Sequence, residues 1–569
     1  MASTASAPGL TSICSSDIFQ NALQPYTGIT FGDVTASPVY NVSVATSDTY
    51  PGIDGRNFCN VTVGYYHDGK SDNVNVWYYF PEAAQYQGRF LATGGGGFAI
   101  NSGSSGLEAG LYYGAASGCT DGGFGWGNEF QDVVLASNGS LNYDMIYNFG
   151  YLSIHEMTVI GKGLAENVYN SSKLYSYYQG CSEGGREGWS QMQRYANTID
   201  GAAIGAPAFR QAFQQVQHDW PQVYEFSNLN GYAPSTCALA KTVNETITAC
   251  DALDGKTDGI VARSDLCRLH YNATSAIGKP YTCSASSSAN PITGALTAVQ
   301  AANGTITAND IAVFLAVQDG PYDNQNRHLY VGYQPGTDTS SNAAGTYNTT
   351  TGIYDVAAIS GIGAKWITYL LHEVASESLS LEGVDVDTLR AWIIEGQQKY
   401  SGTLNTVWTD LSELESAGGK VIHYHGEADN SIPTLSSVIY WEQVRRTLYP
   451  TLAFAESVEK MNEFYRLYLV PGAGHCHQST EGGSWPLTAL GSVIEWVEND
   501  VVPTRLNSTV VAGDEEGEVR RLCSFPYRPM WQGNGTAEFE CVMAEQEALD
   551  TWFPVLDSIP INAYGDGGK

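Results

Sequence analysis

The chain of 569 residues has few charged residues, and far fewer basic than acidic ones. Charged residues make up 15%, against about 25% in an average soluble domain, and 27 Lys and Arg face 59 Asp and Glu. The formal net charge of −32 repels nucleic acids and anionic membranes, so we expect neither as a partner. No apolar run reaches the roughly 18 residues of a membrane span.

The sequence also lacks a CxxC pair and a recognisable signal peptide. The missing CxxC argues against zinc-ribbon and redox sites. Met1–Pro8 has neither a basic nor an apolar region, so we expect that a signal peptide has been removed or replaced. The 11 cysteines and ten Asn-x-Ser/Thr sequons together predict a glycosylated protein that is secreted and extracellular. The sequons are Asn41, Asn60, Asn138, Asn170, Asn244, Asn272, Asn303, Asn348, Asn507 and Asn534.

Strand and helix patterns alternate in the first third of the sequence and again near its end, as in an open parallel sheet. Between about residues 208 and 400, Ser, Thr, Asn, Ala and Gly become more frequent. We predict an α/β fold with a catalytic domain of residues 1–207 and 401–569 and an inserted lid domain of residues 208–400. The predicted strands are Asn73–Phe80, Arg89–Thr93, Tyr175–Gln179, Ala202–Ile204, Val421–Tyr424 and Leu467–Val470, and the predicted helices are Ser153–Tyr169, Arg186–Tyr195 and Ser492–Glu498.

Gly180, Ser182 and Gly184 form a G-x-S-x-G pattern between a predicted strand and a predicted helix. Small residues permit the strained turn that exposes a serine nucleophile, and the helix N-terminus favours the negative charge that develops beside it. Short glycine patterns also arise by chance, and the alternative is a tight turn with a capping serine. As a nucleophile, Ser182 requires a base and an acid from later strands.

Two later strands end in loops that offer these partners in the chain order serine, acid, histidine. His475 is the predicted general base, and Asp429 is the predicted acid that fixes its tautomer and stabilises its protonated form. Both follow strand ends, where the sites of parallel sheets gather. Four neighbouring polar residues remain alternatives: Glu427, His423, His425 and His477.

Two cysteines flank the predicted nucleophile and base. Cys181 directly precedes Ser182, and Cys476 directly follows His475. A disulfide between them would tie the nucleophile turn to the histidine loop and fix two groups that must meet within about 3 Å. The alternative is that each cysteine is buried alone or pairs elsewhere. We predict the bridge, and with it the assignment of Ser182, Asp429 and His475.

Four stretches of the sequence carry a family likeness: GCSEGGREGW at Gly180–Trp189, HGEADNSIP at His425–Pro433, GAGHC at Gly472–Cys476 and RFLATGGGGF at Arg89–Phe98. They resemble the fungal tannase and feruloyl esterase family, and the likeness extends from about Cys14 to about Cys541. That family joins a Cys-Ser pair, an Asp and a His-Cys pair in one active site. The resemblance implies an α/β-hydrolase fold with a large lid, and hydrolysis of a phenolic-acid ester through an acyl-serine intermediate.

A run of four glycines, Gly94–Gly97, follows a predicted strand. Bare backbone N–H groups there can face an oxyanion, and the residue after the nucleophile, Glu183, is expected to supply a second N–H. Within the run we expect Gly95 or Gly96 to be the donor. A plain flexible turn is the alternative.

Three carboxylates, Asp251, Asp254 and Asp258, lie within eight positions of one another beside glycines. Hard oxygen ligands on a sharply turning loop suit calcium, although the spacing does not match an EF-hand. Solvated Asx turns are the alternative. The resemblance implies a calcium loop here, completed by the backbone oxygens of Lys256 and Ile260. Because this loop lies in the predicted lid, calcium is expected to be a structural cofactor.

The resemblance also implies further disulfides. The pairs that it implies are Cys14–Cys59, Cys523–Cys541 and Cys250–Cys267, and we add Cys237–Cys283 as a fourth expected pair. The last of these departs from the family pattern and rests on the two cysteines left over in the lid. Cys119 then remains as a free thiol, expected to be buried and inert.

Two stretches, Ser182–Gln191 and Phe209–Pro221, are closer to tannases than to feruloyl esterases. We therefore predict a serine esterase that hydrolyses galloyl esters and the depside bonds of gallotannins, with a small-molecule or polyphenol ester as substrate. A feruloyl esterase acting on hydroxycinnamate esters of the plant cell wall is the alternative. An inactive hydrolase-fold binding module fits less well because all three predicted catalytic residues are present, and a serine carboxypeptidase has a different elbow sequence.

Overall fold

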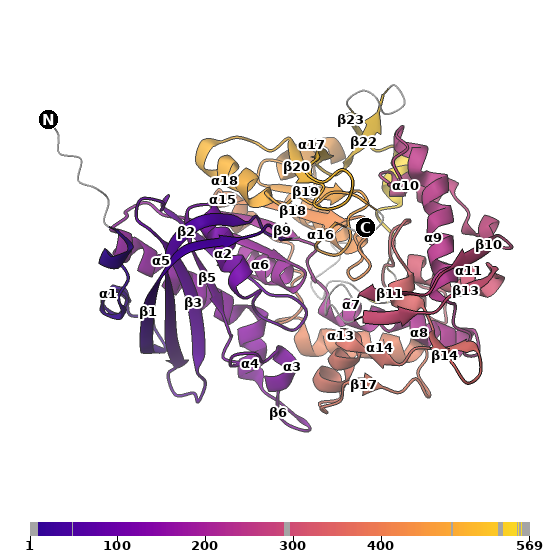
Figure 1. The fold of residues 1–569 in the computed structure, drawn as a ribbon, viewed down its shortest axis with the longest axis horizontal. Coiled ribbons are helices and arrows are strands. Elements are labelled where there is room, and N and C mark those ends of the chain that lie inside the picture. The colour runs from indigo at the N-terminus through magenta and orange to yellow at the C-terminus, as the bar shows by residue number, and fades with distance from the viewer. Residues whose placement is uncertain are drawn as a thin grey trace.

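A nine-stranded mixed sheet forms the centre of the computed structural model (Figure 1). The model describes residues 9–554, 556 and 559, apart from 48, 290–295, 479–481 and 533–538. In the order given below, each of the first three strands is antiparallel to the next. From the fourth strand to the ninth, each is parallel to the next. In sheet order they are β1 (Ile29–Val44), β2 (Ile53–His67), β3 (Val74–Pro81), β5 (Ala115–Thr120), β4 (Arg89–Thr93), β8 (Tyr175–Cys181), β9 (Gly201–Gly205), β18 (Lys420–Gly426) and β19 (Tyr465–Val470).

Helices cover both faces of this sheet because successive strand residues point to opposite sides. In β4, Phe90 and Leu91 enter two different hydrophobic clusters, and Ile204 and Ala203 of β9 do the same. One cluster includes side chains of α5 (Ser153–Tyr169), α6 (Glu183–Arg194) and α16 (Leu435–Leu448), and the other includes side chains of α2 (Ser104–Tyr112) and α18 (Ala489–Asn499). The strand order and the helices on both faces are consistent with an α/β hydrolase.

Residues between β9 and β18 form a second, mainly helical region beside the sheet (Figure 1). Among the described residues of this stretch, no strand joins the nine-stranded sheet. Its main helices are α7 (Gln211–Gln217), α8 (Trp220–Val223), α9 (Thr236–Cys250), α10 (Ser264–His270), α11 (Ala308–Asp319) and α14 (Val386–Tyr400). Leu239, Val243, Phe314 and Val317 belong to a separate hydrophobic cluster within this region. The predicted insertion of residues 208–400 falls in this stretch, while the domain boundaries stay a prediction.

All five predicted disulfides are present, and their Cα atoms lie 5.4–6.1 Å apart. Cys119 is the free cysteine among the described residues, and its side chain is buried, as predicted. Burial raises the pKa of its thiol to about 12, so the nucleophilic thiolate is scarce.

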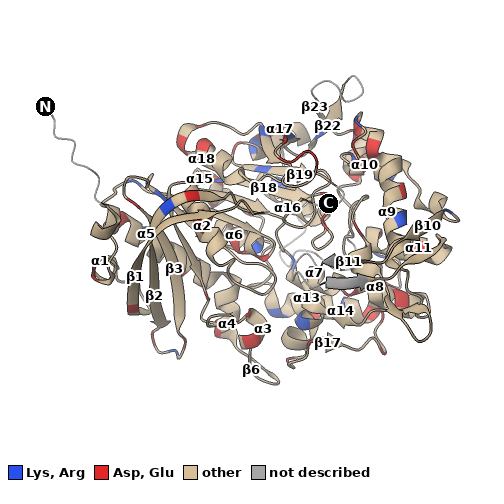
Figure 2. Ribbon diagram, in the orientation of Figure 1, with Lys and Arg blue, Asp and Glu red and all other residues tan. Residues whose placement is uncertain are grey.

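Acidic residues are scattered over helices and loops of both regions (Figure 2). Within the part of the chain that the structure describes, the helices are too short or too polar to cross a bilayer.

Candidate active site

The predicted nucleophile lies on a strained turn between β8 and α6. Ser182 has φ 63° and ψ −120°, a conformation that non-glycine residues rarely adopt. The Ser182 N–H donates to the Gly205 carbonyl at 3.1 Å, and the Ser182 carbonyl accepts from Arg186 N–H at 3.0 Å. A Cβ added to Gly184 would come within 2.7 Å of the Gly95 carbonyl oxygen. The glycine of the predicted pattern is therefore required by close backbone approach.

Ser182, His475 and Asp429 form a hydrogen-bonded chain. His475 Nε2 lies 2.9 Å from Ser182 Oγ, and His475 Nδ1 lies 2.8 Å from Asp429 Oδ2. The Ser431 and Ile432 N–H groups both donate to Asp429 Oδ1 at 2.8 Å. This is the geometry of a nucleophile, a base and an orienting acid.

The environment of Asp429 keeps its carboxylate charged. The side chain is buried, and burial alone would raise its pKa. The charge interaction with His475 and the hydrogen bonds from His425 and His475 outweigh that effect and hold the pKa of Asp429 well below its usual range. Asp429 is thus an ionised acceptor at the pH of any ordinary assay.

The Cys181–Cys476 disulfide joins the two loops that carry Ser182 and His475. These cysteines lie 295 residues apart in the sequence and 6.0 Å apart between Cα atoms. Cys476 itself has φ 63°, so the histidine loop is also held in a left-handed turn. The bridge is located where the sequence predicts it, directly beside Ser182 and His475.

The four alternative residues have other partners than Ser182, and His425 contacts Asp429 Oδ2 at 3.1 Å. Arg528 Nη2 and Ser264 Oγ both donate to Glu427 Oε1 at 2.6 Å. His423 and His425 both contact the hydroxyl of Ser437. His477 Nδ1 contacts the carbonyl of Gln478. His475 and Asp429 are therefore the pair that the fold brings to Ser182.

The glycine run differs from the predicted oxyanion hole. The Gly95 N–H donates to Glu187 Oε2 at 2.9 Å, and the Gly96 N–H donates to the Ala99 carbonyl at 3.1 Å. Both predicted amides are thus already used by the protein. The Glu183 amide begins α6, and the described residues offer it no acceptor, so it keeps its predicted role as a donor. The missed residue is Glu187, which lies buried beneath the glycine loop.

The predicted calcium loop is closed by the Cys250–Cys267 disulfide. Both carboxylate oxygens of Asp251 accept backbone N–H groups, from Asp258 and Gly259, at 3.0 Å. Lys256 Nζ pairs with Asp258 Oδ2 at 2.9 Å. Burial, with the neighbouring carboxylates adding to it, raises the pKa of Asp254 to about 6. Over the described ranges, no three His, Cys, Asp or Glu side chains are grouped to hold a metal ion, so the calcium assignment stays a prediction.

Helix α7 presents a buried polar face beside the triad, which the sequence did not reveal. Gln211 Nε2 donates to Glu183 Oε2 at 2.7 Å, and Gln215 Nε2 donates to Gln211 Oε1 at 2.6 Å. His218 Nε2 lies 2.7 Å from the carbonyl of Ser431, in the loop that carries Asp429. This face therefore borders both the nucleophile turn and the acid loop.

Several polar atoms on this helical segment have no hydrogen-bond partner within the described part of the chain. They are Gln214 Oε1, Gln215 Oε1, Gln217 Nε2 and Asp219 Oδ2. The residues are almost fully buried, and burial raises the pKa of Asp219 well above its usual range. Buried polar groups are nearly always satisfied in folded proteins, so these atoms indicate contact with water or a ligand.

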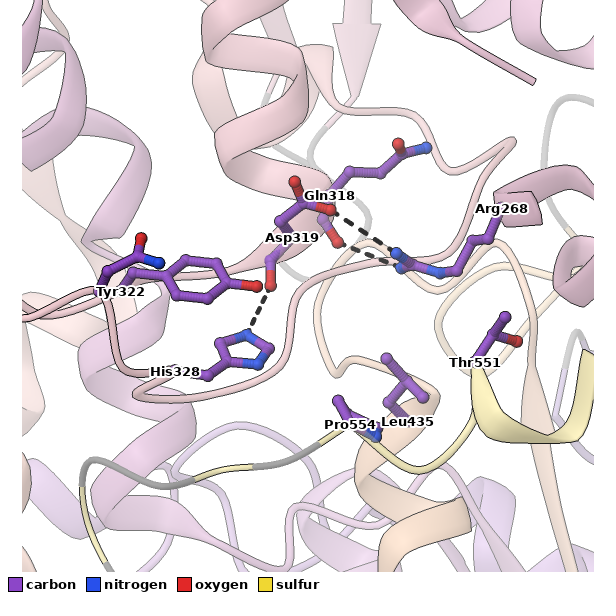
Figure 3. Close-up of a pocket in the computed structure, with 9 residues that line it drawn as sticks. Arg268, Gln318, Asp319, Tyr322, His328, Leu435, Thr551 and Pro554 are labelled. Atoms are coloured by element: carbon purple, nitrogen blue, oxygen red, sulfur yellow. Dashed lines mark hydrogen bonds and ion pairs between the residues drawn. The ribbon is translucent and has the colours of Figure 1, made fainter. Parts of the chain in front are cut away.

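A separate cavity of about 290 Å³ lies between the helical insertion, the start of α16 and the C-terminal segment (Figure 3). Arg268 Nη2 donates to the Gln318 carbonyl at 3.2 Å, and the Tyr322 ring stacks on His328 with centroids 4.4 Å apart. None of the residues that line it is a predicted site residue. Ser182, Asp429 and His475 are not among the residues that line this cavity.

Comparison with known proteins agrees with this architecture. A family model described as tannase and feruloyl esterase matches residues 59–547. The chain is 40% identical to a tannase of Aspergillus oryzae over 99% of this chain and 98% of that protein. It is 30% identical to a probable feruloyl esterase of Arthroderma benhamiae over 85% of each.

Two solved structures of a tannin acyl hydrolase and a feruloyl esterase have a similar fold. The tannin acyl hydrolase from Aspergillus niger matches with a TM-score of 0.92 and 46% identity, covering 98% of this chain and 100% of that one. Feruloyl esterase B from Aspergillus oryzae matches with a TM-score of 0.70 and 25% identity, covering 92% and 100%. The chain therefore belongs to the tannase and feruloyl esterase family and is a carboxylic ester hydrolase.

Proposed function

We propose that the protein hydrolyses galloyl esters, including the depside bonds of gallotannins, through an acyl-serine intermediate. The observation that carries this proposal is the Ser182–His475–Asp429 chain lying beside a buried polar face with unsatisfied atoms. The sequence is also more similar to the tannase of Aspergillus oryzae, at 40% identity, than to the probable feruloyl esterase of Arthroderma benhamiae, at 30%.

The reaction follows from the order of the hydrogen bonds. His475 Nε2 takes the proton of Ser182 Oγ as that oxygen attacks the ester carbonyl, and Asp429 stabilises the imidazolium. The Glu183 amide donates to the oxygen that becomes negative. His475 then returns the proton to the leaving alcohol, which departs and leaves the acyl-serine. A water molecule repeats the same steps and releases the free acid.

The ring of the acid is expected to lie against the polar face of α7. A galloyl ring carries three hydroxyl groups, whereas a feruloyl ring carries one hydroxyl and one methoxy group on a longer acrylate. Gln215 and Asp219 offer unsatisfied oxygens that can accept from ring hydroxyls. A site built to bond hydroxyls discriminates strongly against analogues that lack them, because its own buried groups are then left unpaired.

Turnover of two model esters tests the choice of acid. We expect kcat/KM for methyl gallate to exceed that for methyl ferulate, since only the gallate ring satisfies the polar face. An equal or reversed preference would replace the tannase proposal with the feruloyl esterase alternative.

Removing a polar group from α7 or from the residues that directly follow it is expected to lower gallate turnover selectively. Gln215→Leu and Asp219→Leu should each reduce kcat/KM for methyl gallate by about 10- to 100-fold, since each removes a hydroxyl acceptor. Hydrolysis of p-nitrophenyl acetate, which has no phenolic acid ring, should change little. Gln222→Leu is the matched control, because Gln222 on α8 donates instead to the Asn342 carbonyl. Equal losses on both substrates would contradict the assignment.

We further propose that the loop of Asp251, Asp254 and Asp258 holds a structural calcium ion, with the backbone oxygens of Lys256 and Ile260. Two of these carboxylates are buried close together, and a divalent cation would offset their mutual repulsion. Binding requires Lys256 to release Asp258.

Calcium removal is expected to lower the melting temperature by several degrees, because an ion that binds only the folded state stabilises it. The measurement is thermal unfolding with and without a chelator, followed by addition of calcium or magnesium. Asp254→Asn should abolish the response. A melting temperature that ignores both chelator and calcium would contradict the proposal.

We also infer that the region of residues 208–400 acts as a lid over Ser182.

We infer further that the protein is secreted and glycosylated. Five disulfides support an oxidising compartment. The nine sequon asparagines among the described residues are exposed or half-buried, which leaves room for glycans, and Asn534 lies outside the described residues. Mass spectrometry before and after glycosidase treatment tests the occupancy of each sequon.

A further inference from the structure

A chain of buried polar groups continues behind the triad acid. Strand β18 places His423 and His425 on the same face, two residues apart, and both side chains are fully buried. Both imidazoles contact one hydroxyl on α16: Ser437 Oγ lies 2.9 Å from His423 Nε2 and 2.7 Å from His425 Nδ1. A single serine therefore bridges the two histidines.

The two ends of this chain have clear partners. His425 Nε2 lies 3.1 Å from Asp429 Oδ2 and 3.0 Å from the Ile432 carbonyl. His423 Nδ1 lies 2.8 Å from the hydroxyl of Tyr465. Asp429 Oδ2 is also the oxygen that contacts His475 Nδ1. The buried chain thus ends on the same carboxylate oxygen that orients the catalytic base.

These contacts fit one arrangement of protons in which both histidines are neutral. His425 Nε2 faces a carboxylate and a carbonyl, which only accept, so Nε2 carries the proton. His425 Nδ1 then accepts from the Ser437 hydroxyl, and Ser437 Oγ accepts from His423 Nε2–H. His423 Nδ1 accepts in turn from the Tyr465 hydroxyl. Burial lowers the pKa of His423 well below its usual value, in agreement with a neutral ring.

We propose that His425 and Ser437 are positioning residues of the active site. Ser437 fixes the tautomer of His425, and His425 donates its Nε2–H to Asp429 Oδ2. The same bond withdraws charge from the oxygen that faces His475, so the imidazolium is stabilised less than it would be by a bare carboxylate. The inference rests on the proposed roles of Asp429 and His475. It adds that the hydrogen bond from His425 to Asp429 determines how strongly Asp429 stabilises protonated His475.

Two substitutions of His425 test this arrangement. His425→Leu removes a donor that holds Asp429 Oδ2 in place against His475, so kcat for p-nitrophenyl acetate should fall about 10- to 100-fold with little change in KM. Without that hydrogen bond the Asp429 carboxylate stabilises the protonated form of His475 more strongly, so the acid limb of the kcat/KM profile should move to higher pH. His425→Gln keeps an amide donor for Asp429 and should restore most of kcat and return the limb toward its original position.

Substitutions on α16 test the link through the hydroxyl. Ser437→Ala should reproduce the pH shift in part, because His425 loses the donor that fixes its tautomer. Ser436→Ala is the matched control, since Ser436 is the equally buried neighbour on the same helix. The melting temperature of each variant separates loss of folding from loss of function.

The inference is overturned if His425→Leu leaves kcat and the acid limb unchanged. It is equally overturned if the Gln and Leu variants lose activity alike with no shift of the limb, since that result indicates packing alone. Asp429→Asn distinguishes this failure from failure of the proposed mechanism. If the triad assignment is right, Asp429→Asn is nearly inactive whatever the His425 variants do.

Discussion

Replacing Ser182 with alanine is expected to lower kcat about 10⁴-fold or more without unfolding the protein, because the attacking oxygen is lost while its neighbours stay in place. The Ser182 N–H and carbonyl bonds to Gly205 and Arg186 are made by the backbone and survive the change. The substitution also leaves no buried charged group without its partner. The measurement is kcat for p-nitrophenyl acetate and methyl gallate, with thermal unfolding as the test of folding.

A second observation makes this result specific to the acyl-serine. Wild-type enzyme should be labelled at Ser182 by an organophosphate, and the mass of the labelled peptide identifies the residue. Ser190→Ala is the matched control, because Ser190 is a buried serine of α6 that donates only to the Glu187 carbonyl. Undiminished ester turnover by the Ser182→Ala variant would remove the proposed mechanism.

The triad could be predicted because it depends on local patterns and on one property of parallel sheets. The strands that end at Cys181, Gly426 and Val470 run parallel in the sheet, so their carboxyl ends gather at one edge. A G-x-S-x-G turn at the first of them and polar loops after the others therefore meet in space. Helix α5 has the predicted bounds because its apolar residues recur at helical spacing, and β4 has them because it is a short buried run that ends at glycines.

The oxyanion glycine could not be chosen from the sequence because the answer depends on a side chain 92 residues away. Glu187 occupies the Gly95 amide, and a short bridge with Ala99 occupies that of Gly96. Sequence shows which amides lack a side chain, whereas only the fold shows which amides already have acceptors. The backbone donor that remains clear is Glu183, which is fixed by its place at the start of a helix.

The polar face of α7 escaped prediction for a different physical reason. Glutamine is mostly an exposed residue, so the sequence of Gln211–Gln217 reads as a solvated helix. Packing between the nucleophile turn, the acid loop and α14 buries it instead. The signal that distinguishes the two cases is the set of unsatisfied buried atoms, which exists only once the chain has folded.

Removing the Cys181–Cys476 bridge is expected to affect both stability and catalysis. The cysteines are 295 residues apart, and on the loop-entropy model a cross-link across such a long loop contributes roughly 5–6 kcal/mol. The double variant Cys181→Ala, Cys476→Ala should therefore unfold at lower denaturant concentration. Its kcat should also fall, since the left-handed turns at Ser182 and Cys476 are no longer tied together and His475 loses its fixed distance to the nucleophile.

Removal of the Cys523–Cys541 bridge is the matched comparison. That bridge spans 18 residues and joins β21 (Val519–Cys523) to β23 (Phe539–Met543), and neither cysteine is a sequence neighbour of a triad residue. Its double alanine variant should lose roughly 3 kcal/mol or less of unfolding free energy and keep its kcat. Equal losses of kcat in the two variants would show that the Cys181–Cys476 bridge acts on overall stability alone. A selective loss in the active-site variant, measured well below its melting temperature, would show that the bridge sets the distance between Ser182 and His475.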